Sequence, residues 1–229
     1  MVDVLERGSI AFVYRPRVQT EVARGIEDVQ AFFVVLVPAG GGLARRVRVG
    51  RKRLPDRQGR ERFWAYVDRA GVRPADVVDD LAAAEYWTKT RGLRHQPGPR
   101  LAGEGAYVIA RHGAHVHLAY ALRGRAASEV HEDLRIAPEA SYVVAAFAQT
   151  LPGAAASGQE RRFVPLEPGH LDVPGAEFVL IAAGDAVLGE LEPRLERAAE
   201  DETMAELSRL VRDASGRPSS APLLEGIWH

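Results

Sequence analysis

The chain is divided into many short apolar runs, and this spacing constrains the fold more than any other feature of the sequence. Each run is rich in β-branched or aromatic side chains and ends at a glycine, a proline or a charged turn. Runs of this kind are typical of β-strands, and strands joined by short turns pair antiparallel. The runs are GSIAFVY (8–14), VQAFFVVLVP (29–38), LARRVRVG (43–50), ERFWAYVD (61–68), AYVIAR (106–111), HVHLAYAL (115–122), SYVVAAFA (141–148) and EFVLIAA (177–183).

Three other segments carry helical signals. The segment PADVVDDLAAAEYW (74–87) begins with a proline, which suits a first helical position, and has apolar residues at helical spacing. Ser128 is a candidate N-cap for SEVHEDLRI (128–136), and residues 188–213 have a helical pattern. We therefore expect an α+β protein, dominated by antiparallel sheet, with a helical C-terminal segment.

A weak internal similarity indicates how these elements are divided. Residues 8–14 align with residues 103–109 at glycine, alanine, aromatic, valine and apolar positions, and each run begins a strand-rich half. The similarity predicts two loosely similar α+β lobes, at residues 1–100 and 101–215, that meet at a central site. Residues 216–229 then form a linker and an apolar tail, in which Trp228 favours docking on the same domain or on a second subunit.

Composition excludes several classes of function. The 30 basic and 31 acidic side chains leave a net charge of −1, so attraction to a polyanion must be local rather than global. The chain has no cysteine, which excludes disulfides, thiol catalysis and cysteine metal sites. No secretory signal and no membrane-length apolar run are visible, so we expect a cytoplasmic protein with no membrane partner.

The densest group of candidate ligand-binding side chains follows the predicted helix at residues 74–87. Within eight residues, the segment TKTRGLRH offers hydroxyls, an ammonium and two guanidinium groups. This set suits a phosphate, a phosphate ester, a polycarboxylate or a nucleic acid. The alternative is that its arginines pair with Glu85, Glu104 and the acidic segment before them. The candidate residues are Thr88, Lys89, Thr90, Arg91, Arg94 and His95.

A second basic patch lies in the turn after residues 43–50. Arg51, Lys52 and Arg53 follow a strand in which Val47 and Val49 face a core. The patch can hold a phosphate backbone, or it can be a solvated turn whose charges prevent edge-to-edge pairing of strands.

Histidines supply the candidates for catalysis. His115 and His117 lie two residues apart in a predicted strand, so they share a face, and such pairs can bind zinc. A metal site needs a third ligand that the sequence does not place, so these two residues are weak metal candidates and no metal or other cofactor is predicted. His95 and His117 can act as acid and base near neutral pH if the fold brings them together.

Several motifs together give a resemblance to a known group of proteins. The chain resembles a bacterial family of conserved hypothetical proteins, over most of its length and including the terminal LLEGIW. No activity is attached to that family, so the resemblance implies a stand-alone protein and no mechanism. The motifs are IAFVYRPRV, DVQAFFVVLVP, GRKRLPD, RERFWAYVD, TKTRGLRHQPGPR and HVHLAYAL.

These observations favour a protein that binds an anionic ligand, either a phosphate-containing small molecule or nucleic acid, in a binding or regulatory role. Two alternatives remain open. One is a His-dependent hydrolase or phosphotransferase that uses His95, His115 and His117. The other is a scaffold subunit that forms oligomers through its C-terminal tail.

Overall fold

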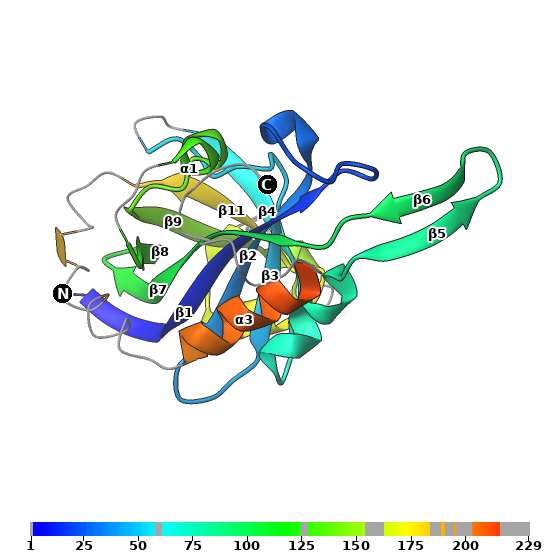
Figure 1. The fold of residues 1–229 in the computed structure, drawn as a ribbon. Coiled ribbons are helices and arrows are strands. Elements are labelled where there is room, and N and C mark those ends of the chain that lie inside the picture. The colour runs from blue at the N-terminus through cyan, green and yellow to red at the C-terminus, as the bar shows by residue number, and fades with distance from the viewer. Residues whose placement is uncertain are drawn as a thin grey trace.

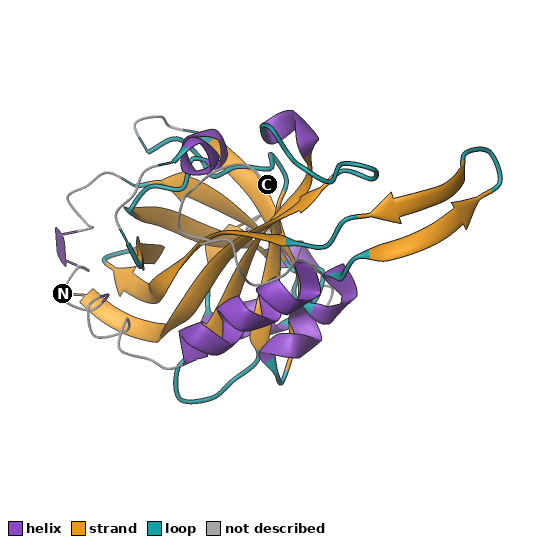
Figure 2. Cartoon of the chain, viewed as in Figure 1, coloured by secondary structure: helices purple, strands orange, loops and turns teal. Residues whose placement is uncertain are grey.

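The computed structural model describes residues 2–57, 61–124, 128–153, 163–183, 189–190, 195 and 203–215. Most of the described elements are strands, and eight of them form a closed antiparallel barrel (Figures 1 and 2). Going round the barrel the order is β9, β11, β4, β3, β2, β1, β7 and β8, and β8 pairs with β9 to close the ring. The strands are β1 (Val2–Pro16), β2 (Val29–Pro38), β3 (Ala44–Val49), β4 (Arg62–Gly71), β7 (Arg100–His112), β8 (His115–Leu122), β9 (Glu139–Phe147) and β11 (Glu177–Ala182).

The expected two-lobe α+β fold is wrong. Strand β1, from the first half of the chain, pairs along its length with β7, from the second half, and Gly8 lies opposite Tyr107. The two similar runs at residues 8–14 and 103–109 are therefore neighbouring strands of one barrel. The error arose because local sequence patterns identify strands but do not indicate which distant strands pair.

The barrel interior is a packed core. Along β1, Ile10, Phe12 and Tyr14 face inward and join the main cluster of buried side chains, while Ala11 and Val13 face outward. Alternating side chains of a strand point to opposite faces, which explains this division. The outward residues are buried as well, because helical segments cover this part of the wall, so β1 and β2 are apolar on both faces.

The covering layer consists of α3 (Thr203–Ser215) and two short 3-10 helices, η2 (Pro74–Val77) and η3 (Asp79–Leu81). Val77, Leu81, Leu207 and Val211 from these helices pack on the outer wall. Figure 1 shows α3 lying across the strands there. The long helix expected over residues 74–87 is therefore wrong. Two 3-10 turns bury its apolar residues against the barrel, and residues 84–88 form a strand instead.

The two ends of the barrel carry different elements. One end is where β3 stops and β4 begins. We call it the arm end, because a two-stranded ribbon of residues 84–96 leaves the barrel there, and it also carries η1 (Ile26–Asp28) and α1 (Glu129–Leu134). Ser128 caps α1 through a hydrogen bond that its Oγ accepts from the His131 N–H, as expected. At the opposite end, called the far end, lie η4 (Ala148–Thr150), the short strand β10 (Phe163–Pro165) and η6 (Pro168–Asp172).

A buried arginine fastens the 3-10 helices to the sheet. Arg46, on the outer face of β3, is 3% exposed and donates hydrogen bonds to Asp68, to both carboxylate oxygens of Asp80 and to the Val77 carbonyl, at 2.6–3.0 Å. Its guanidinium also lies 5.2 Å from the centre of the Phe33 ring. The arginine thus neutralises two carboxylates at the junction of β3, β4 and η3.

Replacing Arg46 with Ala should destabilise the fold by about 3 kcal/mol, because removing one partner of a buried ion pair leaves the others uncompensated. Arg48→Ala is the matched control, since Arg48 lies on the same strand and face, is partly exposed and forms no hydrogen bond or ion pair with its side chain among the described residues, and should cost less than about 0.5 kcal/mol. Urea unfolding of the two variants measures the difference. Equal midpoints would show that the Arg46 cluster contributes no net stability.

Candidate functional site

Strands β5 (Ala84–Thr88) and β6 (Gly92–Gln96) form a separate two-stranded ribbon that projects from the barrel, and we call residues 84–96 the arm (Figure 1). The arm is attached at its base. The Gln19 N–H donates to the His95 carbonyl at 2.8 Å, and the Gln96 amide donates to the Pro16 carbonyl at 3.0 Å. The imidazole of His95 lies 3.0 Å from the carboxylate of Glu21. Contacts with residues 16–21 therefore fix the direction in which the arm leaves the barrel.

The tip of the arm is a tight turn organised by Thr88. The hydroxyl of Thr88 donates to the Gly92 carbonyl and accepts from the Arg91 N–H, at 3.2 and 3.1 Å. Gly92 has a positive φ of 67°, a conformation that glycine adopts without steric cost. The turn exposes Lys89, Thr90 and Arg91.

The two faces of the arm carry different side chains. Trp87 lies opposite Leu93 on one face, and they are 77% and 47% exposed. Tyr86, which is 43% exposed, lies opposite Arg94 on the other face. Large apolar side chains are therefore held in solvent on a ribbon that is too thin to bury them.

The cations of the arm have no acidic partner within the described ranges. Lys89, Arg91 and Arg94 form no ion pair there, although carboxylates are close in sequence. Asp76 is paired with Arg73, and Asp80 with Arg46. The sequence left open that the arginines of the arm pair with Glu85, Glu104 and the acidic segment before them. Such pairing is not observed among the described residues.

Glu104 lies on the outer face of β7. Burial raises the pKa of its carboxyl, and the charges of Arg212 and Arg123 only partly offset this effect. Glu104 therefore belongs to the side of the barrel that α3 covers, and it does not neutralise the arm.

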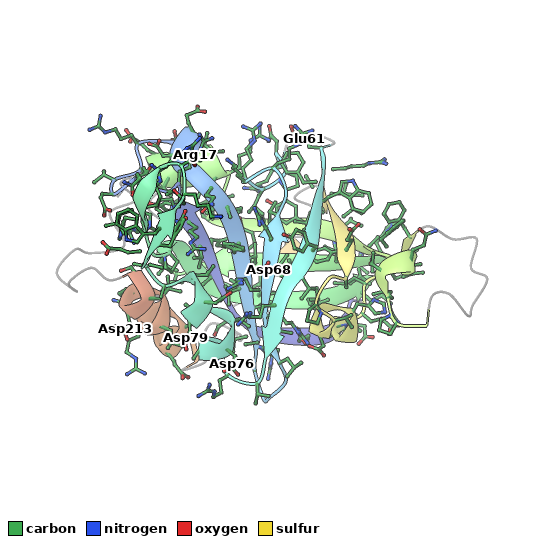
Figure 3. The ribbon with its side chains drawn as sticks, turned by 90° about the vertical axis from the view of Figure 1, so that its right-hand side faces the viewer. Arg17, Glu61, Asp68, Asp76, Asp79 and Asp213 are labelled. Carbon is green, nitrogen blue, oxygen red and sulfur yellow. The ribbon has the colours of Figure 1, made fainter. Side chains whose placement is uncertain are left out.

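The second basic patch, at residues 51–53, lies at the arm end of the barrel as well. Lys52 donates to the Val29 carbonyl at 2.6 Å, and Arg51 stacks 5.8 Å from the centre of the Phe63 ring. Burial, followed by the charges of Arg17 and Arg48, lowers the pKa of Lys52. Figure 3 shows Arg17 at the same end of the molecule as Glu61, which follows this loop. Lys52 is thus held against the barrel, whereas Arg51 is exposed beside the Phe63 ring and Arg53 is partly exposed next to them.

The candidate catalytic histidines are not brought together. His95 lies at the base of the arm, whereas His115 and His117 lie at the start of β8, at the far end of the barrel. His117 is 3% exposed, contacts the Ser141 hydroxyl at 3.2 Å and has its ring 6.0 Å from that of His112. Burial, and then the charges of His112 and His115, lowers its pKa to about 4. Among the residues that the structure describes, no group of three or more His, Asp or Glu side chains can hold a metal ion.

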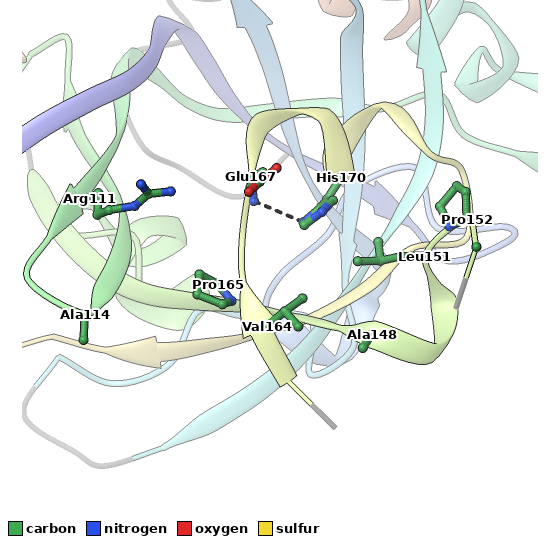
Figure 4. A pocket seen from close by; sticks show the side chains of 10 residues that line it. Arg111, Ala114, Ala148, Leu151, Pro152, Val164, Pro165, Glu167 and His170 are labelled. Carbon is green, nitrogen blue, oxygen red and sulfur yellow. Dashed lines mark hydrogen bonds between the residues drawn. The ribbon is translucent and has the colours of Figure 1, made fainter. Parts of the chain in front are cut away.

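A cavity of about 440 Å³ at the far end was not predicted from the sequence. It lies between the β7–β8 turn and η6, with Arg111 on one side and Glu167 and His170 on the other (Figure 4). The Glu167 N–H donates to Nδ1 of His170 at 3.1 Å. Arg111 is more than fifty positions from Glu167 and His170 in the chain, so no local motif connects the two sides of the cavity.

The far end also contains a buried polar network that the sequence did not reveal. Arg45, 2% exposed, contacts Glu6 at 2.5 Å and Asp172 at 2.7 Å, and the Tyr107 hydroxyl donates to Glu6 at 2.7 Å. The network connects η6 to the barrel interior. Because its charged groups are already paired with one another, it serves packing rather than ligand binding.

Comparisons with known proteins give no relative from which a role can be transferred. No family model, no curated protein and no solved structure matches the chain. Among the residues that the structure describes, no helix is both long and apolar enough to span a membrane. The apolar tail proposed for oligomer formation lies outside the described residues.

The pKa of His117 predicts how stability depends on pH. The folded protein binds a proton on this side chain only near pH 4, whereas the unfolded chain does so near 6.5, so stability is present above about pH 6.5 and is lost as pH falls toward 4. In His117→Asn, the loss of stability between pH 7 and 4.5 should be smaller by about 2–3 kcal/mol. Urea unfolding at a series of pH values tests this. His115→Asn is the control, since His115 is exposed; parallel curves for wild type and His117→Asn would refute the prediction.

Proposed function

We propose that the protein binds nucleic acid through the arm. The observation that carries the proposal is the combination of three cations without acidic partners in the described residues, Lys89, Arg91 and Arg94, with exposed aromatic side chains on a projecting ribbon. Arginine and lysine supply most of the affinity of proteins for phosphate backbones, and aromatic side chains contact bases. Cytoplasmic location, expected from the sequence, is compatible with this ligand.

A polymeric anion suits this surface better than a small phosphate compound. Small ligands bind in concave pockets that remove most of their surface from water. The arm projects from the barrel, and the cavity described at the far end is lined by other residues, such as Arg111 and His170. A long anion can instead gain affinity from several weak phosphate contacts spread along a ribbon.

Catalysis by the histidines has less support. Acid and base groups must both reach the reacting atoms, within hydrogen-bond distance. His95 and His117 lie at opposite ends of the barrel, and His117 is buried with a pKa of about 4. A binding role therefore accounts for more of the exposed chemistry of the molecule than a hydrolase or phosphotransferase does.

The net charge of −1 limits the affinity and sets its salt dependence. With no global positive field, attraction depends on the few cations of the arm and decreases steeply as salt is added. Arg51 and Arg53, on either side of Lys52 at the same barrel end, are further points of contact for a ligand long enough to reach them.

The double variant Arg91→Ala/Arg94→Ala should bind fluorescent oligonucleotides about tenfold more weakly at about 50 mM salt. With two fewer cations, the variant displaces fewer counterions from the nucleic acid when it binds. The slope of log K against log salt should become shallower by about 1.5. Fluorescence anisotropy measures both quantities, and circular dichroism should show an unchanged fold because Arg91 is exposed and Arg94 is only partly buried.

The charge-matched control is Arg7→Ala/Arg111→Ala, which removes two exposed arginines outside the arm. Its affinity should fall much less than that of the arm variant. Equal losses for the two double variants would mean that only net charge matters, and the proposal that the arm is the site would then be wrong.

A further inference from the structure

We propose that the arm takes single-stranded nucleic acid, with an unpaired base stacked on Trp87 while Lys89, Arg91 and Arg94 contact the adjacent phosphates. This inference rests on the proposed function and specifies its ligand. It depends on three features of the arm: the environment of Trp87, the distribution of its side chains between two faces, and the chemistry that a duplex would require.

The environment of Trp87 differs from that of the other described tryptophan. Trp64, on the outer wall of β4, packs against the rings of Phe147 and Phe163 at 5.8 and 5.7 Å. Trp87 is 77% exposed, and its apolar neighbours are Leu93 opposite and Gly92, where a Cβ would lie 3.6 Å from the indole. Most of the indole surface is therefore open to a flat partner that approaches from solvent.

Cations lie near this open ring along the ribbon. Lys89 and Arg91 lie in the turn that begins two residues after Trp87, and Arg94 follows Leu93 on the facing strand, with its side chain on the other face. An arrangement of cations around an exposed aromatic face is the general form of a single-strand binding surface, in which the phosphates follow the charges and each base stacks on a ring. Trp87 and the turn together thus supply both kinds of contact.

The opposite face repeats the combination on a smaller scale. Tyr86 lies directly across from Arg94, and it is also partly exposed. Successive residues of a strand point to opposite faces, so Tyr86 and Trp87 cannot stack on the same base. A flexible single strand can pass round the ribbon and contact both rings, which a rigid duplex cannot do.

Recognition of a duplex would require different side chains. Ribbons that read the major groove do so through hydrogen-bonding side chains that reach base edges. The large exposed side chains on the strands of the arm are Trp87, Leu93 and Tyr86, which offer rings and an aliphatic group. The exposed Glu85 beside them would be repelled by phosphates rather than read a base edge. Bases inside a duplex are already stacked on each other, so these rings gain nothing from them without intercalation.

The test compares an unstructured oligothymidylate of about 20 nucleotides with a duplex that carries the same number of phosphates, at about 50 mM salt. Trp87→Leu removes the ring and keeps an apolar side chain. We expect the wild type to prefer the single strand, and Trp87→Leu to lose about tenfold in affinity for it. Trp64→Leu is the matched control and should bind like the wild type, provided that denaturation shows it folded.

A second measurement reads the contact directly. In the variant Trp64→Phe/Trp228→Phe, Trp87 is the only tryptophan of the chain. Its fluorescence should be quenched when oligothymidylate binds, and quenching should be lost with an oligomer of abasic sugar phosphates, which has charges but no bases. Quenching of equal size by the abasic oligomer would overturn base stacking.

The outcomes separate this inference from the function on which it rests. Equal or tighter binding of the duplex, with no effect of Trp87→Leu, would refute single-strand recognition and leave nucleic-acid binding by the arm in place. Absence of binding to either oligonucleotide at low salt would refute both, and would leave a protein partner as the ligand of the exposed arm.

Discussion

Closure of the sheet by the pairing of β8 with β9 determines where function can lie. Once the ring is closed, its strands have no free edges, and inward side chains such as Phe12, Tyr107 and Tyr120 fill the interior. Barrels of eight strands are just wide enough for side chains to fill, and this one is filled rather than hollow. A ligand must therefore bind at the ends, on the outer wall or on a segment that leaves the barrel, and the arm is such a segment.

Closure also assigns different roles to arginines that are adjacent in sequence. Arg45 points into the barrel and joins the network with Glu6 and Asp172, while Arg46 points outward and binds Asp68 and Asp80. Both are paired and buried, and their pKa values are raised, because the attraction of the carboxylates outweighs the burial that would lower them. These two arginines of β3 thus serve the fold, whereas the cations of the arm have no such partners in the described residues.

Short-range patterns predicted the strands well and their assembly poorly. The runs at residues 29–38, 115–122 and 177–183 coincide closely with β2, β8 and β11, because alternation and β-branched composition are local properties. The barrel was missed because it depends on pairing between residues such as Ser9 and Ala106, about a hundred positions apart. Gly105 marks a close approach of the neighbouring strands β7 and β8, since a Cβ there would lie 2.0 Å from the Ala121 carbonyl oxygen, but it does not indicate which distant strands pair.

The candidate site was predicted only in part, because its residue types are a local property of the sequence and their tertiary arrangement is not. The cations and hydroxyls of residues 88–95 are visible in the sequence, but their setting is not, since Pro74 and the alanines that follow it resemble the start of a helix. In the structure no long helix forms here, because Val77 and Leu81 pack on the barrel from two short 3-10 helices. The chain then leaves the barrel surface and continues as β5. Trp87 is exposed because β5 leaves the barrel surface, and no local motif in the sequence predicts this.

The energetics of the arm favour a role in binding over a role in folding. A two-stranded ribbon gains little stability by itself, and the arm has no third strand beside it in the described part of the chain. Trp87 is 77% exposed and buries little surface in the free protein, so a polar residue at this position would cost the fold little. Contacts of His95 and Gln96 with residues 16–21 nevertheless hold the base in one orientation. The fixed base reduces the entropy lost when a partner binds, and contact with a partner would account for an exposed ring beside cations that have no acidic partners in the described residues.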